Sequence, residues 1–104
     1  MTNDLLFQQI STVQNNTQLL PVTMAAATTI APTTFITFVS GTTNVGTITP
    51  PVTGSVLIGL VFTNGSPGSL LTTGNISVGS TTLVQNKLVL LAYDPSSGKW
   101  YLNN

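Results

Sequence analysis

The chain has 104 residues, of which 41% are hydrophobic and only 4% charged, and its formal net charge is zero. Its four charged side chains are Asp4, Lys87, Asp94 and Lys99, and it contains no His, Cys, Glu or Arg. Acid–base catalysis needs groups that titrate near neutral pH, metal sites need clustered ligands, and nucleic-acid binding needs clustered Lys and Arg. The composition therefore argues against an enzyme, a cofactor or metal site, and a nucleic-acid partner.

The low charge also bears on how the surface is used. A typical domain has about 25% charged residues, and net charge keeps soluble monomers apart. This chain lacks that protection although its mean hydropathy is +0.40. We therefore expect copies of the chain or a larger assembly to cover much of its surface. No run approaches the roughly 18 apolar residues of a membrane helix, so we expect no membrane partner, and the absence of Cys fits assembly in a reducing cytoplasm.

Residues 1–33 contain no Gly and differ in composition from the rest of the chain, and we interpret them as an N-terminal arm. Asn3 is suited to cap a short helix, which would be too short to be stable alone. The plain alternative is an edge strand with a frayed terminus, and the functional interpretation is an arm that clasps a neighbour. The apolar residues expected to dock are Leu5, Leu6, Phe7 and Ile10.

Residues 34–104 are predicted to form a β domain, because short β-branched and aromatic runs alternate with Gly, Pro and Asn turns. The fold class predicted is all-β, a compact antiparallel sandwich or barrel of about seven short strands with an extended N-terminal arm. The expected strands are Thr34–Ser40, Asn44–Thr49, Ser55–Thr63, Asn75–Val78, Thr81–Gln85, Lys87–Tyr93 and Lys99–Leu102.

Several of these strands are apolar on both faces. In the longest, Ile58 and Leu60 point one way while Leu57 and Val61 point the other. A sheet with one solvated face should instead alternate apolar with polar residues. A chain this short has little material to cover both faces, so we favour burial of the second face by another subunit.

The C-terminal two-thirds resembles a small β module that recurs in structural proteins of tailed bacteriophages, often at the ends of fibre and spike chains. The most specific part is the closing segment, in which Tyr93-Asp94 and a small turn precede Lys99-Trp100-Tyr101. The ordered series that carries the resemblance is Val45–Ile48, Pro50-Pro51, Gly54, Phe62–Gly65, Thr72–Ile76, Lys87–Leu90, Tyr93-Asp94 and Gly98–Tyr101.

This resemblance implies a virion structural protein, commonly trimeric. Here the module is nearly the whole chain rather than the end of a shaft, which suits a capsid decoration (cement) protein better than a fibre. The implied partners are further copies, with a homotrimer favoured, and the major capsid protein, and the implied location is the virion.

The alternative is a receptor- or glycan-binding tip of a fibre or spike. For that function Tyr93, Trp100 and Tyr101 are the candidate ligand or interface contacts, because aromatic faces stack on sugars. The plainer interpretation is that Trp100 anchors the last strand on the core while Tyr101 points outward. Asn75 is expected to be a turn residue rather than a ligand-binding amide.

Overall fold

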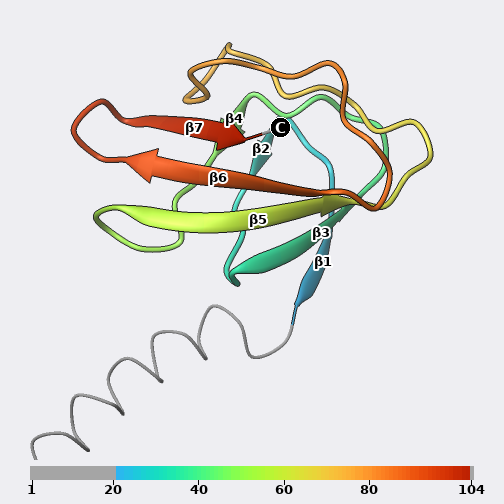
Figure 1. Cartoon of the computed structure of the whole chain (residues 1–104), viewed down its shortest axis with the longest axis horizontal. Coiled ribbons are helices and arrows are strands. Elements are labelled where there is room, and N and C mark those ends of the chain that lie inside the picture. Colours follow the sequence, from blue (N-terminus) through green and yellow to red (C-terminus); the bar gives the residue numbers. More distant parts are fainter. Residues whose placement is uncertain (1–20, 104) are drawn as a thin grey trace, which may run out of the picture.

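The computed structural model describes residues 21–103, which form seven strands in two sheets and contain no helix (Figure 1). This confirms the all-β class and the number of strands. The strands are β1 (Val22–Ala25), β2 (Thr29–Ile30), β3 (Ile36–Ser40), β4 (Thr47–Ile48), β5 (Val56–Phe62), β6 (Leu88–Asp94) and β7 (Lys99–Asn103).

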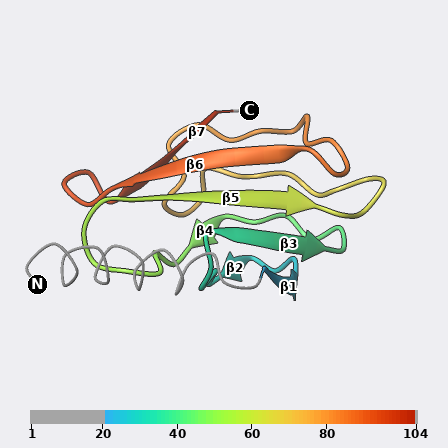
Figure 2. The ribbon, with the colours of Figure 1, turned by 60° about the horizontal axis from the view of Figure 1, so that its bottom comes forward.

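The larger sheet has the strand order β1-β3-β5-β6-β7, and β2 and β4 form the smaller sheet (Figure 2). Strands β1, β3 and β5 are parallel, whereas β5, β6 and β7 are antiparallel. The prediction of an antiparallel sheet is therefore wrong for half of the main sheet. The reason is that parallel neighbours need a crossover, and the chain makes two: it leaves the main sheet after β1 and β3 to form β2 and β4, which are themselves parallel.

The seven strands are not the seven that the sequence predicts. Residues 21–33, assigned to the arm, supply β1 and β2, and Ile30 and Pro32 are buried. The expected strands at 75–78 and 81–85 are not strands. They belong to a long irregular connection between β5 and β6, which bridges Val45 through Leu70 and reaches β7 through a bridge between Ile76 and Trp100. Residues 1–20 of the expected arm lie outside the described part of the chain.

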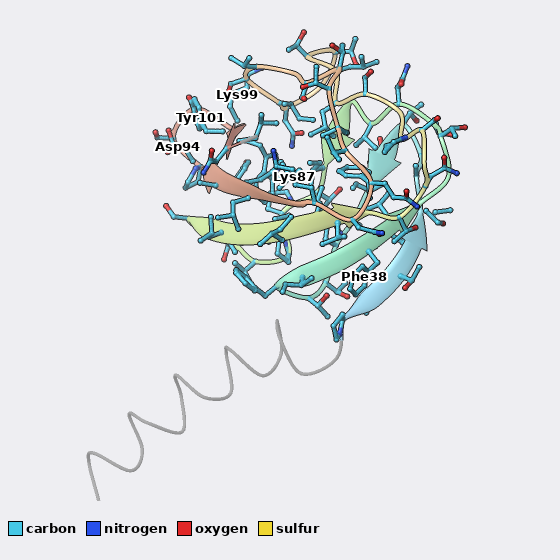
Figure 3. All side chains as sticks on the ribbon, turned by 45° about the vertical axis from the view of Figure 1, so that its right-hand side comes forward. Phe38, Lys87, Asp94, Lys99 and Tyr101 are labelled. Carbon is cyan, nitrogen blue, oxygen red and sulfur yellow. The ribbon has the colours of Figure 1, made fainter. Side chains whose placement is uncertain are left out.

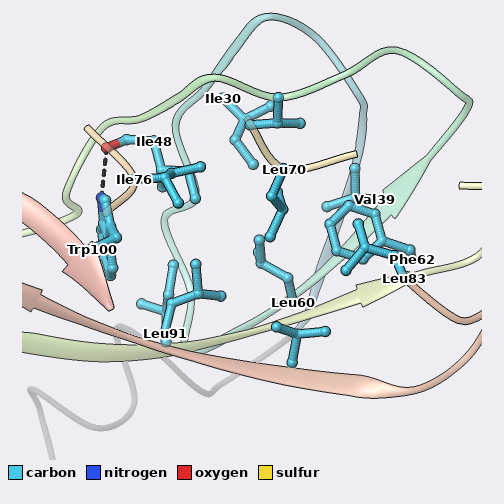
Figure 4. Packing of buried hydrophobic residues seen from close by; sticks show 13 residues of the cluster. Ile30, Val39, Ile48, Leu60, Phe62, Leu70, Ile76, Leu83, Leu91 and Trp100 are labelled. Atoms are coloured by element: carbon cyan, nitrogen blue, oxygen red, sulfur yellow. Dashed lines mark hydrogen bonds between the residues drawn. The ribbon is translucent and has the colours of Figure 1, made fainter. Parts of the chain in front are cut away.

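The hydrophobic core lies between the main sheet and a covering layer made of β2, β4 and the connection from β5 to β6 (Figure 4). The main sheet contributes residues from β3, β5, β6 and β7, and the covering layer contributes the others. No buried side-chain N or O atom in residues 21–103 lacks a hydrogen-bond partner. The core residues are Ile30, Val39, Val45, Ile48, Ile58, Leu60, Phe62, Leu70, Ile76, Leu83, Val89, Leu91 and Trp100.

One hydrogen-bond cluster joins the covering layer to the main sheet. The carbonyl of Ile48 in β4 accepts hydrogen bonds from the indole Nε1 of Trp100 in β7, at 2.8 Å, and from Nδ2 of Asn75, at 2.7 Å. The Ile48 N–H donates to Oδ1 of Asn75 at 2.9 Å, and the Trp100 N–H donates to the carbonyl of Asn75 at 2.8 Å. Asn75 therefore pairs with β4 through its side chain and with β7 through its backbone.

This role corrects the expectation that Asn75 is a turn residue in left-handed geometry. Among the described non-glycine residues only Asn86 has a positive φ. The neighbouring Gly74 explains how Asn75 comes so close to β4, because a Cβ at position 74 would overlap the carbonyl of Gly46 and the hydroxyl of Thr47. A residue without a side chain is needed where two backbones meet this closely.

We predict that Asn75→Ala lowers the free energy of unfolding by about 2–3 kcal/mol, because it removes two hydrogen bonds and leaves a buried backbone N–H unpaired. Asn64→Ala is the matched control: Asn64 only accepts a bond from the exposed N–H of Ser66, so about 0.5 kcal/mol or less is expected. Urea unfolding followed by tryptophan fluorescence measures both. Equal losses in the two variants would contradict the proposed role of Asn75.

Candidate functional site

The feature that stands out as a site is the face of the main sheet that points away from the core, which we call the outer face. Its residues follow from the strand register, since neighbours in register share a face. One row across three strands is Phe38, Val61 and Leu88, and another is Ile36, Gly59 and Leu90. The remaining large or apolar members are Leu57, Ala92 and Tyr101.

The outer face is apolar at its centre, while Thr23, Ser40 and Asn103 add polar side chains toward its edges, and residues 21–103 leave part of the apolar centre exposed. Leu57 is 48% exposed and Leu88 is 44% exposed, although both lie in the middle strands of the sheet. Phe38 and Val61 are half-buried by their neighbours rather than by a covering layer. Contiguous apolar surface on a sheet usually marks an interaction site.

Charges lie at the margins of this face, not within it. Figure 3 shows Asp94, Lys99 and Tyr101 together at the hairpin that joins β6 and β7, with Lys87 near the start of β6 and Phe38 on β3. Lys99 donates to the carbonyl of Gly74 at 3.4 Å. Lys87 is exposed. A partner protein could therefore cover the centre of the face without burying a charge. Burial of an unpaired charge would be costly.

The space above Gly59 on the outer face is filled by a neighbouring side chain. A Cβ there would approach the Leu88 side chain to 2.7 Å and the Ile36 side chain to 3.8 Å. The Leu88 side chain thus leans across the glycine of the neighbouring strand. Gly59 therefore allows Leu88 to lie along the face, and it is itself buried.

The three aromatic residues named from the sequence do not form a common binding surface. Trp100 is fully buried, so it has no surface to offer a sugar or a partner. Tyr93 packs beside it on the core side, with ring centroids 5.0 Å apart. Only Tyr101, which is 48% exposed, lies on the outer face.

Asp94 organises the hairpin turn. Its carboxylate accepts hydrogen bonds from the Ser96 hydroxyl, at 2.8 Å, and from the Ser96 N–H, at 3.1 Å. These bonds, with a smaller contribution from Ser97, hold the pKa of Asp94 below its usual value. The Ser97 hydroxyl in turn lies 3.2 Å from the Tyr101 hydroxyl. A carboxylate that stays ionised and is engaged in a turn is poorly suited to act as a general acid.

The described residues offer little for metal or small-molecule chemistry. Residues 21–103 contain no group of three or more His, Cys, Asp or Glu that could hold a metal ion. No helix in this part of the chain is long and apolar enough to cross a membrane. An uncharged cleft of about 380 Å³ lies between the β2–β4 layer and the following loops, and it is lined by Thr28, Thr29, Thr43, Asn44, Gly46, Thr47, Leu71 and Thr73.

The docking residues expected in the arm, Leu5, Leu6, Phe7 and Ile10, lie outside the described residues. The sequence did indicate that the strands are apolar on both sides, and the structure assigns the sides: Ile58 and Leu60 face the core, whereas Leu57 and Val61 face outward. The sequence could not show that loops, rather than a second large sheet, cover the core-facing side of the main sheet. Comparisons with protein-family models, curated proteins and solved structures find no match.

We predict that a charge affects the two sides of β5 differently. Ile58→Lys places an unpaired charge in the core and should unfold the chain, whose total stability is expected to be only about 5–15 kcal/mol. Val61→Lys lies on the outer face and should cost about 1 kcal/mol, leaving a folded chain. Circular dichroism with thermal melting measures both. Unfolding by Val61→Lys would mean that the outer face belongs to the fold of the single chain.

Proposed function

We propose that this chain is a bacteriophage structural protein, specifically a capsid decoration (cement) protein that stabilises the shell through contacts between subunits. The observation that carries the proposal is the uncharged apolar outer face of the main sheet, which residues 21–103 leave uncovered. The resemblance of residues 44–101 to modules of phage structural proteins supplies the biological setting.

The physical argument starts from the parallel strands. Sheets containing parallel strands are normally covered on both faces, yet β1, β3 and β5 are covered on one face only within the described chain. A chain with almost no charge has little to oppose association. Burial of the outer face against another protein would cover the second face of the parallel strands, and the low charge of the chain would not oppose it. We therefore propose a homo-oligomer, with a trimer favoured.

The proposed mechanism is mechanical rather than catalytic. A protein that binds only the assembled lattice stabilises that lattice by mass action. The partner would be the major capsid protein and the location the virion, after assembly in the host cytoplasm. In the arm, burial of Leu5, Leu6, Phe7 and Ile10 would contribute on the order of 5 kcal/mol before ordering costs. Repetition of that contact across a symmetric oligomer gives avidity.

The described geometry supports an open, sandwich-like subunit for this role. The edge strands of the main sheet, β1 and β7, are not paired with each other, so we class the fold as an open two-layer sandwich rather than a barrel. An open sheet keeps its outer face flat enough to pack against a second protein surface.

The glycan-binding alternative has less support. An aromatic platform needs exposed rings, but Trp100 is fully buried and its indole N–H is bonded to Ile48. Tyr101 alone remains exposed, and its hydroxyl lies within hydrogen-bonding distance of Ser97. An enzymatic function has less support still, since Asp94 is the one carboxylate side chain in residues 21–103.

We predict that native mass spectrometry of the full chain finds a homo-oligomer, with the trimer as the main species. Val61→Lys should shift it toward the monomer, because the substitution would bury a charge in the interface. Thr53→Lys, at an exposed position in the β4–β5 connection rather than in a strand of the main sheet, is the control and should leave the mass unchanged. A wild-type chain that stays monomeric at micromolar concentration would refute the proposed oligomer.

We also predict that deletion of residues 2–18 leaves a folded β domain that no longer binds capsids. The reason is that the core of residues 21–103 is complete without those residues, whereas the proposed docking side chains lie among them. Co-sedimentation with capsids of the cognate phage, compared with the full chain, measures the loss. Undiminished binding by the truncated chain would remove the arm from the proposed mechanism.

A further inference from the structure

The outer face is too small to hold an oligomer together by itself. Five strands about 4.8 Å apart and four to seven residues long give a face of roughly 20 × 20 Å, or about 400 Å². A stable interface buries about 800 Å² on each partner. If two copies simply met face to face, about half of the required area would be missing, so another part of the chain must contribute.

The remaining part of the chain is residues 1–20, and it joins the described domain at an edge of the outer face. It leads into β1, which is the edge strand of the main sheet, so it starts at the rim of the outer face. Twelve positions separate Ile10 from Val22. They span up to about 40 Å if extended and about 18 Å if helical, and the sheet is only about 19 Å wide.

We infer that Leu5, Leu6, Phe7 and Ile10 of one copy lie on the outer face of the next copy. This inference rests on the proposed homo-oligomer, because a segment bound to its own sheet would leave nothing apolar for a neighbour to bury. It makes the next copy, rather than the capsid itself, the direct contact of these side chains, so deletion of residues 2–18 would abolish capsid binding through loss of the oligomer's avidity. The segment would cover Phe38, Val61 and Leu88, which share one row of the outer face.

The symmetry of this contact agrees with a closed ring. The segment and the outer face are different surfaces, so copies can contact one another head to tail, and such contacts form a ring when the rotation between copies closes. A face-to-face contact between identical surfaces would instead give a dimer. Exchange of the segment around a threefold axis therefore accounts for the trimer that the proposed function favours.

Charge also fits this placement. Asp4 is the one charged residue among residues 1–20. Lys87 is exposed immediately before Leu88, at the margin of the outer face, and no described residue bonds to its ammonium group. When Leu5 and Phe7 lie beside Leu88, Asp4 comes within reach of Lys87. The two charges would compensate each other outside the desolvated centre of the interface.

The test uses the absence of Cys, which makes every thiol an introduced one. Full-length Phe7→Cys is mixed with full-length Leu88→Cys carrying a mass tag, subunits are exchanged, and disulfides are formed under mild oxidation. The control partner is Val78→Cys, which is 68% exposed but lies in the connection that covers the inner face. We expect the mixed disulfide of Phe7→Cys with Leu88→Cys to form about tenfold faster than that with Val78→Cys, as proximity raises the effective concentration.

The double variant Phe7→Cys/Leu88→Cys separates the two directions of docking. Exchange between copies gives disulfide-linked trimers on a non-reducing gel, whereas docking on the same copy gives a cross-linked monomer and overturns the inference. Equal rates with Leu88→Cys and Val78→Cys also overturn it. Native mass spectrometry of the unmodified chain is measured in parallel: an oligomer without the disulfide refutes only this inference, and a monomer refutes the proposed oligomer itself.

Discussion

The fold depends on the hydrogen-bond cluster around the carbonyl of Ile48. The two-residue strand β4 pairs only with β2, so little else in the backbone fixes its position over the main sheet. Trp100 supplies a large apolar surface and one indole N–H to that carbonyl, and Asn75 acts as a substitute strand that satisfies β4 on one side and β7 on the other. Buried polar groups stabilise a structure only when all of them are satisfied, and here a single asparagine meets that condition. The irregular covering layer is thereby tied to a regular sheet.

That covering layer explains why one face of the main sheet is buried in the core while the other, the outer face, is partly exposed. β2 and β4 lie on the same side of the main sheet because both crossovers between parallel strands pass over that side, and the connection between the antiparallel strands β5 and β6 lies there as well. In the described residues nothing is left for the other side. Within residues 21–103 the centre of the outer face therefore stays apolar and partly exposed, and this is the ground for the proposal that another protein covers it. Since almost no charged side chain interrupts it, the cover can be dry and apolar, which is the kind of contact that repeated structural subunits use.

The absence of charge also limits what the molecule can do. Asp94 is occupied by the hairpin turn, Lys99 by the carbonyl of Gly74, and Trp100 by the core. These three side chains are thus engaged in the fold, whereas Lys87 stays exposed. The proposed function depends instead on the apolar area of the outer face. The proposed exchange of residues 1–20 between copies also relies on apolar area, because the only charged side chain it adds is that of Asp4.

The sequence by itself determined the β class, most of the strands from Thr34 onward and the apolar character of both sides of the longest strand, because these follow from residue type and a period of two. It also predicted the burial of Trp100. It could not determine that β1, β3 and β5 are parallel, since strand direction depends on where the chain goes between strands. Nor could the sequence show that Asn75 hydrogen-bonds the backbone of Ile48 rather than serving as a turn residue, because Ile48 lies 27 positions away along the chain. Only the tertiary structure decided which apolar side became core and which stayed exposed, because that depends on the side that the crossovers cover.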